Sequence, residues 1–260
     1  MASPPLPCLP GELLALAPVQ SSAYFLDVDG TLLEIKPRPE DVVADAGLRA
    51  LLTGLACAAN GALGLVSGRT IGDLDRIFAP LIFPAVGQHG AEIRFPDQSH
   101  RRPSRAALDP VRQALMDFAA ARPELSLEDK GAALTVHFRQ APERAGEVLE
   151  FLGALARANG LAVQQGKMVA ELKEAHHDKG RGIAALLATP PFAGRKPVFI
   201  GDDLTDESGF HFVNAQGGIS VRAGAAGIST HARYLLHDPS GVRAELQRLL
   251  AGHKRKELRP

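Results

Sequence analysis

The feature that most constrains the fold is a short apolar run that ends in two aspartates. Residues 23–26 are Ala-Tyr-Phe-Leu, without helical periodicity, which is typical of a strand buried on both faces of a parallel sheet. Asp27 and Asp29 follow at once and therefore occupy the carboxyl end of that strand, the edge where open α/β sheets bind ligands. Alternate residues can project the same way, so we expect the two carboxylates to converge. Gly30 lets the chain turn away.

Two converging carboxylates repel each other. At about 4 Å and an effective dielectric near 20 the repulsion is on the order of 4 kcal/mol, which raises one pKa by roughly three units unless a cation intervenes. The pair therefore predicts a protonated aspartate, a bound metal, or each at a different stage. A calcium loop of the EF-hand type does not fit, because Leu32 and Arg38 stand where its glycine and its glutamate belong.

Three more apolar runs end in polar residues. Residues 62–66 lead to Ser67 and Arg69, residues 83–86 lead to His89, and residues 198–200 lead to an acidic loop that includes Asp202 and Asp206. Taken alone, Ser67 is more typical of a turn and His89 of packing. The acidic loop is self-repelling without a divalent cation, and its oxygen ligands favour magnesium.

Helices are predicted between these strands, at residues 46–59, from the Thr70 cap to residue 78, and from the Asp178 cap to residue 187. Lys179 falls in the first turn of the last of these, where the helix dipole disfavours a cation. A flexible lysine that tolerates this penalty and a lysine with a chemical role are equally good explanations of that position.

The alternating strand and helix pattern is interrupted after Arg94. Residues 109 to 173 predict helix, two strands, helix and two strands, which is an α+β unit. We therefore predict a catalytic core at 21–100 and 174–260, an inserted domain at 101–173, and a flexible tail at 1–20. Charged side chains lie on the inserted strands and their turns; each alone is typical of a solvated sheet face, but together they suit a polyhydroxylated ligand. They are Glu128, Lys130, His137, Arg139 and Glu171.

Composition limits the partners and the compartment. The chain has 29 basic and 29 acidic side chains, which gives no reason to expect nucleic acid or an anionic membrane as a partner. Two cysteines are too few for a disulfide framework and suit a reducing compartment. The proline-rich start lacks a basic n-region, and no apolar stretch approaches a membrane span. We expect a cytoplasmic protein.

Together the strand ends predict phosphoryl transfer through a covalent aspartyl-phosphate. Asp27 attacks phosphorus, and Asp29 protonates the leaving alkoxide and later activates water. Ser67 holds a phosphoryl oxygen, and Lys179 adds positive charge. Mg²⁺ is held by acidic groups, for which we predict Asp27, the backbone carbonyl of Asp29, Asp202 and Asp206.

Four motifs stand in the order found in the haloacid-dehalogenase-like (HAD) phosphohydrolases: DVDGT at Asp27 to Thr31, Ser67, Lys179, and GDDLTD at Gly201 to Asp206. From about residue 22 to 250 the chain more closely resembles the trehalose-6-phosphate phosphatase family, through LDVDGTL, VSGR, HGAE, LEDKGAALTVHFR and GDDLTDE.

The resemblance implies an α/β fold, with a doubly wound, parallel-sheet HAD-like (Rossmannoid) core and an inserted α+β cap. It also implies hydrolysis of trehalose 6-phosphate, with trehalose-6-phosphate synthase as a functional partner. Glu128, Lys130 and Glu171 are expected to grip the sugar hydroxyls, and Arg69 and His89 to contact substrate.

The chain departs from the family after Glu171, where Lys173-Glu174-Ala175 replaces the usual arginine and proline. Three alternatives stay open. They are a phosphatase for another sugar phosphate, such as sucrose phosphate or mannosyl-phosphoglycerate, a catalytically silent sensor or regulatory domain docked on a synthase, and a phosphomutase.

Overall fold

The computed structural model describes residues 6–7, 11–102, 106–131, 133–166 and 168–257. The chain forms two compact units. Unit 1 contains the chain up to Arg101 and again from Asp178 onward, and unit 2 runs from Arg102 to His177. The second crossing between the units thus follows His177, whereas we predicted it after residue 173.

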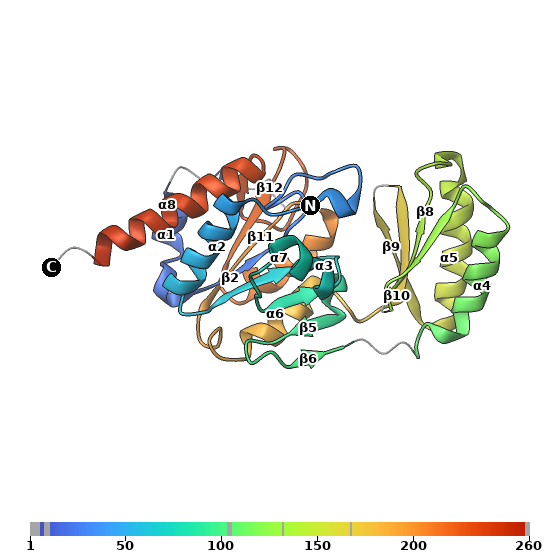
Figure 1. Ribbon diagram of the computed structural model, residues 1–260, viewed down its shortest axis with the longest axis horizontal. Coiled ribbons are helices and arrows are strands. Elements are labelled where there is room, and N and C mark those ends of the chain that lie inside the picture. Colours follow the sequence, from blue (N-terminus) through green and yellow to red (C-terminus); the bar gives the residue numbers. More distant parts are fainter. Residues whose placement is uncertain (1–5, 8–10, 103–105, 132, 167, 258–260) are drawn as a thin grey trace. The chain divides into compact units, whose positions relative to one another are not determined.

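The centre of unit 1 is a mainly parallel sheet (Figure 1). In the order of the sheet, which begins with β1, all neighbouring strands are parallel as far as β4. The last two strands, β5 and β6, pair antiparallel at the edge. In sheet order the strands are β1 (Leu6–Pro7), β13 (Tyr234–Leu236), β12 (Ile219–Ala223), β11 (Lys196–Gly201), β2 (Ser22–Leu26), β3 (Leu63–Val66), β4 (Ala85–Gly87), β5 (Glu92–Arg94) and β6 (His100–Arg101).

The strand that precedes the two aspartates lies inside this sheet. Every residue of β2 is buried, because β11 and β3 pair with its two edges and apolar side chains cover both faces. Phe25 stacks on Phe192, with the ring centroids 5.3 Å apart. Burial on both faces explains why the run is apolar without alternation, as the sequence predicted.

Some helices of unit 1 begin at residues whose side chains cap them. Asp45 accepts a hydrogen bond from Leu48 N, and Thr70 accepts one from Asp73 N. Helix α2 contacts α8, and α6 contacts α7. The helices are α1 (Glu12–Leu16), α2 (Ala46–Ala58), α3 (Ile71–Phe78), α6 (Lys179–Leu187), α7 (Glu207–Ala215) and α8 (Pro239–Glu257).

The prediction of a flexible tail at 1–20 is wrong for the residues that the structure describes. Helix α1 is docked on α8 because the buried Glu245 carboxylate accepts hydrogen bonds from Gly11 N at 3.1 Å and Leu13 N at 3.2 Å. Leu13 is fully buried in the core. Residues 1–5 and 8–10 lie outside the described part. The carboxylate thus fixes this segment by satisfying amides at a helix start.

Unit 2 is a four-stranded antiparallel sheet in the order β7, β8, β10, β9. Helices α4 and α5 lie together on one of its faces (Figure 1), over a separate apolar core. The elements are α4 (Asp109–Ala120), β7 (Ser126–Asp129), β8 (Ala133–His137), α5 (Ala145–Asn159), β9 (Leu161–Gly166) and β10 (Val169–Glu174). Gly160 closes α5, because it takes a left-handed φ of 66°.

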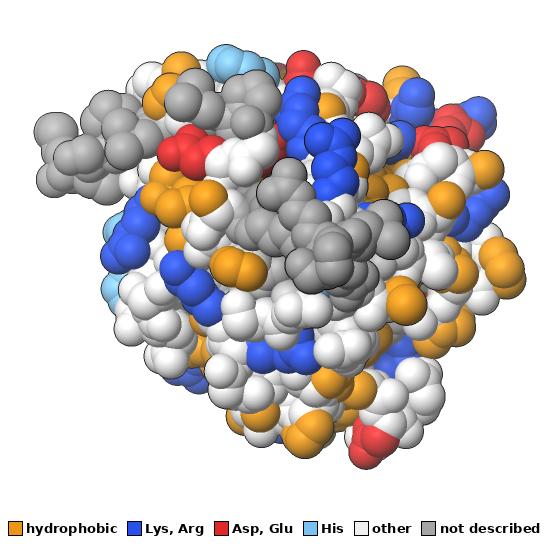
Figure 2. Space-filling view, turned by 90° about the vertical axis from the view of Figure 1, so that its left-hand side faces the viewer, with side chains coloured by type: hydrophobic (Ala, Val, Ile, Leu, Met, Phe, Trp, Pro, Cys, Tyr) orange, Lys and Arg blue, Asp and Glu red, His pale blue; other side chains and the backbone are white. Residues whose placement is uncertain are grey.

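The surface carries mixed charge. The face in Figure 2 has basic and acidic side chains interspersed with hydrophobic ones. Among the described residues, every helix is either too short or too polar to cross a lipid bilayer.

Candidate active site

Lys179 connects the predicted nucleophile to the acidic loop. Its Nζ lies 2.8 Å from Asp27 Oδ1 and 2.6 Å from Asp206 Oδ1, and all three side chains are buried. Asp27 leaves β2 as predicted, and its N–H donates to Ile200 O on β11. Asp178 caps α6 through Arg181 N, which places Lys179 in the first helical turn. The position that opposes the helix dipole is thus stabilised by two carboxylates.

Asp206 organises the loop that follows β11. Its Oδ2 accepts hydrogen bonds from Asp202 N at 2.9 Å and Asp203 N at 3.0 Å, while Oδ1 faces Lys179. Gly201 is required here, because a Cβ on it would lie 2.3 Å from Asp206 Cγ. Thr31 Oγ1 donates to Asp202 Oδ1 at 3.1 Å and so ties the loop to the segment after β2.

Three carboxylates form one group. Asp27, Asp202 and Asp206 each offer an oxygen, and these oxygens lie within 4.8 Å of one another. Burial raises the pKa of Asp27 to about 7. Burial, with repulsion from Asp206 and Asp203, raises that of Asp202 to about 6. Burial alone lowers the pKa of Lys179, but Asp206 and Asp27 outweigh it and raise that pKa.

This donor set fits Mg²⁺. All three side chains supply oxygen, and one ammonium does not balance three crowded carboxylates. Gly30 makes the close approach possible, since it has a φ of 83° and a Cβ on it would lie 2.2 Å from Asp202 Oδ2. Asp29, which we expected to contribute its backbone carbonyl, is not in the group of side chains.

The carboxylate of Asp29 is paired with Arg69. Arg69 Nε lies 2.6 Å from Asp29 Oδ2 and Nη2 lies 2.7 Å from Oδ1, while Nη1 donates to Pro39 O. We expected repulsion from Asp27 to keep a proton on Asp29. The structure instead gives Asp29 a two-pronged cationic partner, the Arg69 guanidinium. Arg69 lies 40 residues after Asp29 in the chain, so no local sequence pattern indicates that the two are in contact.

Ser67 and His89 lie beside this pair. Ser67 is buried after β3, and its Oγ accepts from Arg69 N at 3.1 Å. His89 N donates to Ser67 O, and the His89 ring packs so closely on Gly68 that a Cβ there would lie 2.4 Å from Nε2. A left-handed φ of 54° at His89 turns the ring to this side.

The segment after β4 braces the core. Glu92 Oε2 accepts a hydrogen bond from Ile71 N at the start of α3. Gly90 packs against the start of α6, where a Cβ would lie 2.2 Å from Asp178 O. Two glycines inside α6 also allow close contacts, Gly180 with Ser208 O and Gly182 with Val86. Backbone contacts therefore determine the position of the helix that carries Lys179.

The predicted sugar-binding residues gather on one sheet face of unit 2. Glu128, Thr135, Glu171 and Gln164 are directly opposite one another across β7, β8, β10 and β9 and so share a face. Lys130 Nζ lies 2.6 Å from Glu171 Oε1, which also accepts from Thr135 Oγ1 at 3.0 Å. Thr135 and Gln164 were not predicted. Thr135 stands two residues before His137 on β8 and therefore on the same face, a signal that could have identified it.

Comparison with known proteins shows to which family this arrangement of residues belongs. The trehalose-phosphatase family model matches residues 25–240, which include every residue of the two sites described above. The chain belongs to the trehalose-phosphatase family. A trehalose-6-phosphate phosphatase of Escherichia coli is 44% identical over 206 residues, which cover 78% of this chain and 77% of that protein.

Solved structures support the same family and fold. A trehalose-6-phosphate phosphatase related protein is 25% identical, with a TM-score of 0.75 over 90% of this chain and 99% of its own. A haloacid dehalogenase-like hydrolase from Bacteroides thetaiotaomicron, 19% identical, has a TM-score of 0.66 over 88% of this chain and 99% of its own. The predicted HAD-like α/β fold and the enzyme class, a phosphoric monoester hydrolase, are confirmed for this trehalose-phosphatase family member.

Proposed function

We propose that this member of the family hydrolyses trehalose 6-phosphate to trehalose and phosphate through an aspartyl-phosphate on Asp27. The observation that carries the proposal is the buried contact of Lys179 with both Asp27 and Asp206 at the carboxyl ends of β2 and β11. A cation so close to the nucleophile opposes the repulsion between Asp27 and an approaching phosphate dianion.

The first step converts the phosphate ester of the sugar into an acyl phosphate, a mixed anhydride, on Asp27. An Asp27 carboxylate oxygen attacks phosphorus, the bond from phosphorus to the sugar oxygen breaks, and Asp29 gives that oxygen its proton. In the second step Asp29 takes a proton from water, the water oxygen attacks phosphorus, and the bond to Asp27 breaks. Ser67, whose Oγ accepts from Arg69 N, retains its own proton to donate to a phosphoryl oxygen.

Asp29 has to be released and protonated before it can act as an acid. We propose that Arg69 turns from Asp29 to the arriving phosphoryl group, because a guanidinium pairs with phosphate as well as with carboxylate. Asp29 then loses its cationic partner, and its oxygens are free to carry the proton for the leaving group. Arg69 would thereby couple substrate binding to the proton supply, and His89, packed on Gly68, would brace the loop that carries it.

The carboxylates of Asp27 and Asp202, together with the Asp29 carbonyl, would hold Mg²⁺, which when bound supplies positive charge to the phosphoryl oxygens. Asp206 belongs to the same group, but its two oxygens already accept from Lys179 and from two amides. We therefore propose that Asp206 acts mainly by orienting Lys179 and the loop.

The polar row of unit 2, which is the sheet face with Glu128, Thr135, Glu171 and Gln164, supports a sugar as the leaving group. Glu128, Lys130 and Glu171 offer the acceptors and donors that hydroxyls need, and sugar hydroxyls would share or replace the Lys130 contact with Glu171. The reaction class that supplies this substrate is the synthesis of the disaccharide phosphate, so a trehalose-6-phosphate synthase is the expected functional partner. Cys57, a free and exposed thiol, is consistent with a reducing cytoplasm.

Phosphate release tests the proposal. The substrates are trehalose 6-phosphate, sucrose 6-phosphate, glucose 6-phosphate and p-nitrophenyl phosphate, each with magnesium and with a chelator. Strong magnesium-dependent preference for trehalose 6-phosphate, lost in Asp27→Asn, is expected. Preference for another ester would overturn the proposed substrate, and an isomer without free phosphate would indicate a mutase. Substantial activity in Asp27→Asn would contradict the aspartyl-phosphate, and no turnover would favour a sensor.

A further inference from the structure

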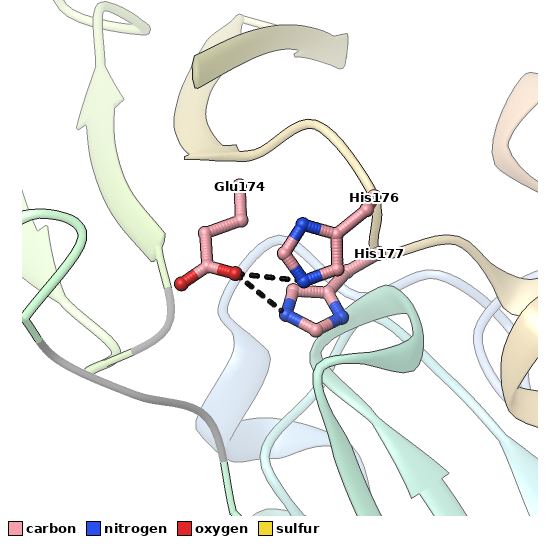
Figure 3. A group of neighbouring side chains, drawn as sticks. All are labelled: Glu174, His176 and His177. Atoms are coloured by element: carbon pink, nitrogen blue, oxygen red, sulfur yellow. Dashed lines mark ion pairs between the residues drawn. The ribbon is translucent and has the colours of Figure 1, made fainter. Parts of the chain in front are cut away.

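The segment that ends unit 2 gathers three side chains of the types that bind metals. Glu174 is the last residue of β10, and His176 and His177 follow it. One oxygen, Glu174 Oε2, lies 2.9 Å from His176 Nε2 and 3.2 Å from His177 Nε2. Figure 3 shows both rings turning a nitrogen toward this oxygen. The cluster is separate from the carboxylate group of unit 1 and takes no part in the phosphoryl chemistry proposed above.

The spacing suits a small four-coordinate cation. With bonds of about 2.0–2.1 Å, two ligand atoms of a tetrahedral zinc ion lie roughly 3.3 Å apart. The two contacts of Glu174 are close to that separation, and the three ligand atoms all lie within 4.8 Å. Small side-chain rotations would therefore let one ion replace the two direct contacts.

Two of the three proposed ligand side chains are largely buried, and the third is accessible to solvent. The side chains of Glu174 and His177 are 16% and 19% exposed, whereas that of His176 is 59% exposed. Lys173 Nζ donates to His177 O at 3.0 Å and fixes the backbone there. The two imidazole rings are 4.1 Å apart and tilted by 48°.

We propose that Glu174, His176 and His177 form a binding site for one divalent cation of the zinc class, with a fourth position open to solvent. Two imidazoles and one carboxylate are a ligand set that zinc uses, and nitrogen donors favour it over magnesium. The three oxygens of Asp27, Asp202 and Asp206 have the opposite preference. The ion would fasten the end of β10 to the last residue of unit 2.

Zinc titration of the magnesium-saturated protein tests the site. Saturating magnesium keeps the carboxylates of unit 1 occupied, and calorimetry is expected to show one bound Zn²⁺. His176→Gln and His177→Gln should each weaken zinc binding at least tenfold. Even the substitution of a residue that only hydrogen-bonds to a metal ligand lowers metal affinity about 10–100-fold. Because His176 is largely exposed, its variant should fold normally, which circular dichroism checks.

A second histidine pair provides the matched control. His231 also lies near a glutamate, with its Nδ1 2.9 Å from Glu207 Oε2. The His211 and His231 ring centroids are 5.8 Å apart, however, and these residues form no such ligand group. His211→Gln should leave zinc affinity unchanged. Co²⁺ in place of zinc should give the intense visible absorption of a tetrahedral site, and this absorption should be absent from the His176→Gln, His177→Gln double variant.

Hydrogen exchange gives a readout independent of affinity. Zinc should slow exchange of the backbone amides at 174–178 in the parent protein and not in the double variant. The proposal is overturned if the parent protein binds no zinc in the presence of magnesium. It is also overturned if His176→Gln and His177→Gln bind zinc as tightly as the parent, because the ion would then be held elsewhere.

Discussion

Arg69 donates from Nε and Nη2 to the two carboxylate oxygens of Asp29, at 2.6 and 2.7 Å. The proposed proton carrier is therefore held by a cation whose side chain also bonds Pro39 O. This pair links the turn after β3 to the loop after β2. Arg69 therefore orients Asp29 and is also a candidate to bind the phosphoryl group.

Replacing Arg69 tests this relationship. In Arg69→Gln, turnover of trehalose 6-phosphate should fall on the order of 100-fold, because a misplaced acid loses its alignment. Steady-state kinetics measures the loss. Arg76→Gln, on α3, removes a side chain that donates to Glu40 O and should retain parent activity. Parent-like turnover in Arg69→Gln would show that Asp29 needs no such support.

Lys179 should also matter for folding. Lys179→Met leaves Asp27 and Asp206 buried beside each other without their cation, and breaking a buried pair costs about 3–5 kcal/mol of unfolding free energy. Urea unfolding with a chelator measures the loss, and magnesium should restore part of it. Lys196→Met removes an exposed lysine that bonds Leu16 O, and its unfolding free energy should hardly change. Equal stability of the two variants would argue against this role.

Gly30→Ala should disrupt the acidic loop. The added Cβ would lie 2.2 Å from Asp202 Oδ2, and the φ of 83° is strained for any L side chain. Gly227→Ala separates these causes, since Gly227 has a φ of 85° with nothing within 4 Å. We expect both variants to lose about 1–2 kcal/mol from strain, but only Gly30→Ala to lose magnesium-dependent turnover. Parent-like turnover in Gly30→Ala would contradict the described approach of Asp202.

We expect Asp45 to account for part of the stability that the fold loses in acid. Hydrogen bonds from Leu48 N and Arg243 lower its folded-state pKa. A carboxylate with a lowered pKa stabilises the fold above its unfolded pKa of about 3.9, and this contribution is lost as the pH falls through the folded value. Asp45→Ala should cost about 0.5–2 kcal/mol at pH 7. Unfolding curves should show the difference from the parent shrinking below pH 4, and a constant difference would exclude this origin.

Lys130 should act on the sugar. In Lys130→Met, catalytic efficiency should fall about 10–100-fold for trehalose 6-phosphate, because hydroxyls lose a donor and Glu171 loses its partner. The efficiency on p-nitrophenyl phosphate should change much less. A comparable loss on both esters would show that Lys130 serves the fold or the chemistry instead.

Local patterns predicted the strand ends and the caps well. The apolar runs before Asp27 and Ser67 are buried strands, and Asp178 and Thr70 cap the helices expected of them. These features depend on neighbours in the sequence, so a single chain contains the information.

Contacts between distant segments were not predictable in the same way. The Arg69 pair with Asp29 and the Glu245 contact with Leu13 N join segments 40 and 232 residues apart. Neither side chain differs locally from a solvated one. At the start of α8, Asp238 Oδ1 accepts from Gly241 N, and the helix continues to Glu257.

The glycine contacts around α6 have a consequence for sequence change. A side chain added at Gly90, Gly180 or Gly182 meets Asp178 O, Ser208 O or Val86. Two of these obstacles are main-chain carbonyls, which no substitution elsewhere can trim away. Directed evolution should therefore find no compensating mutation for Gly90→Ala or Gly180→Ala short of shifting the whole helix. Libraries that seek new substrates can leave these positions fixed and vary the polar row on unit 2.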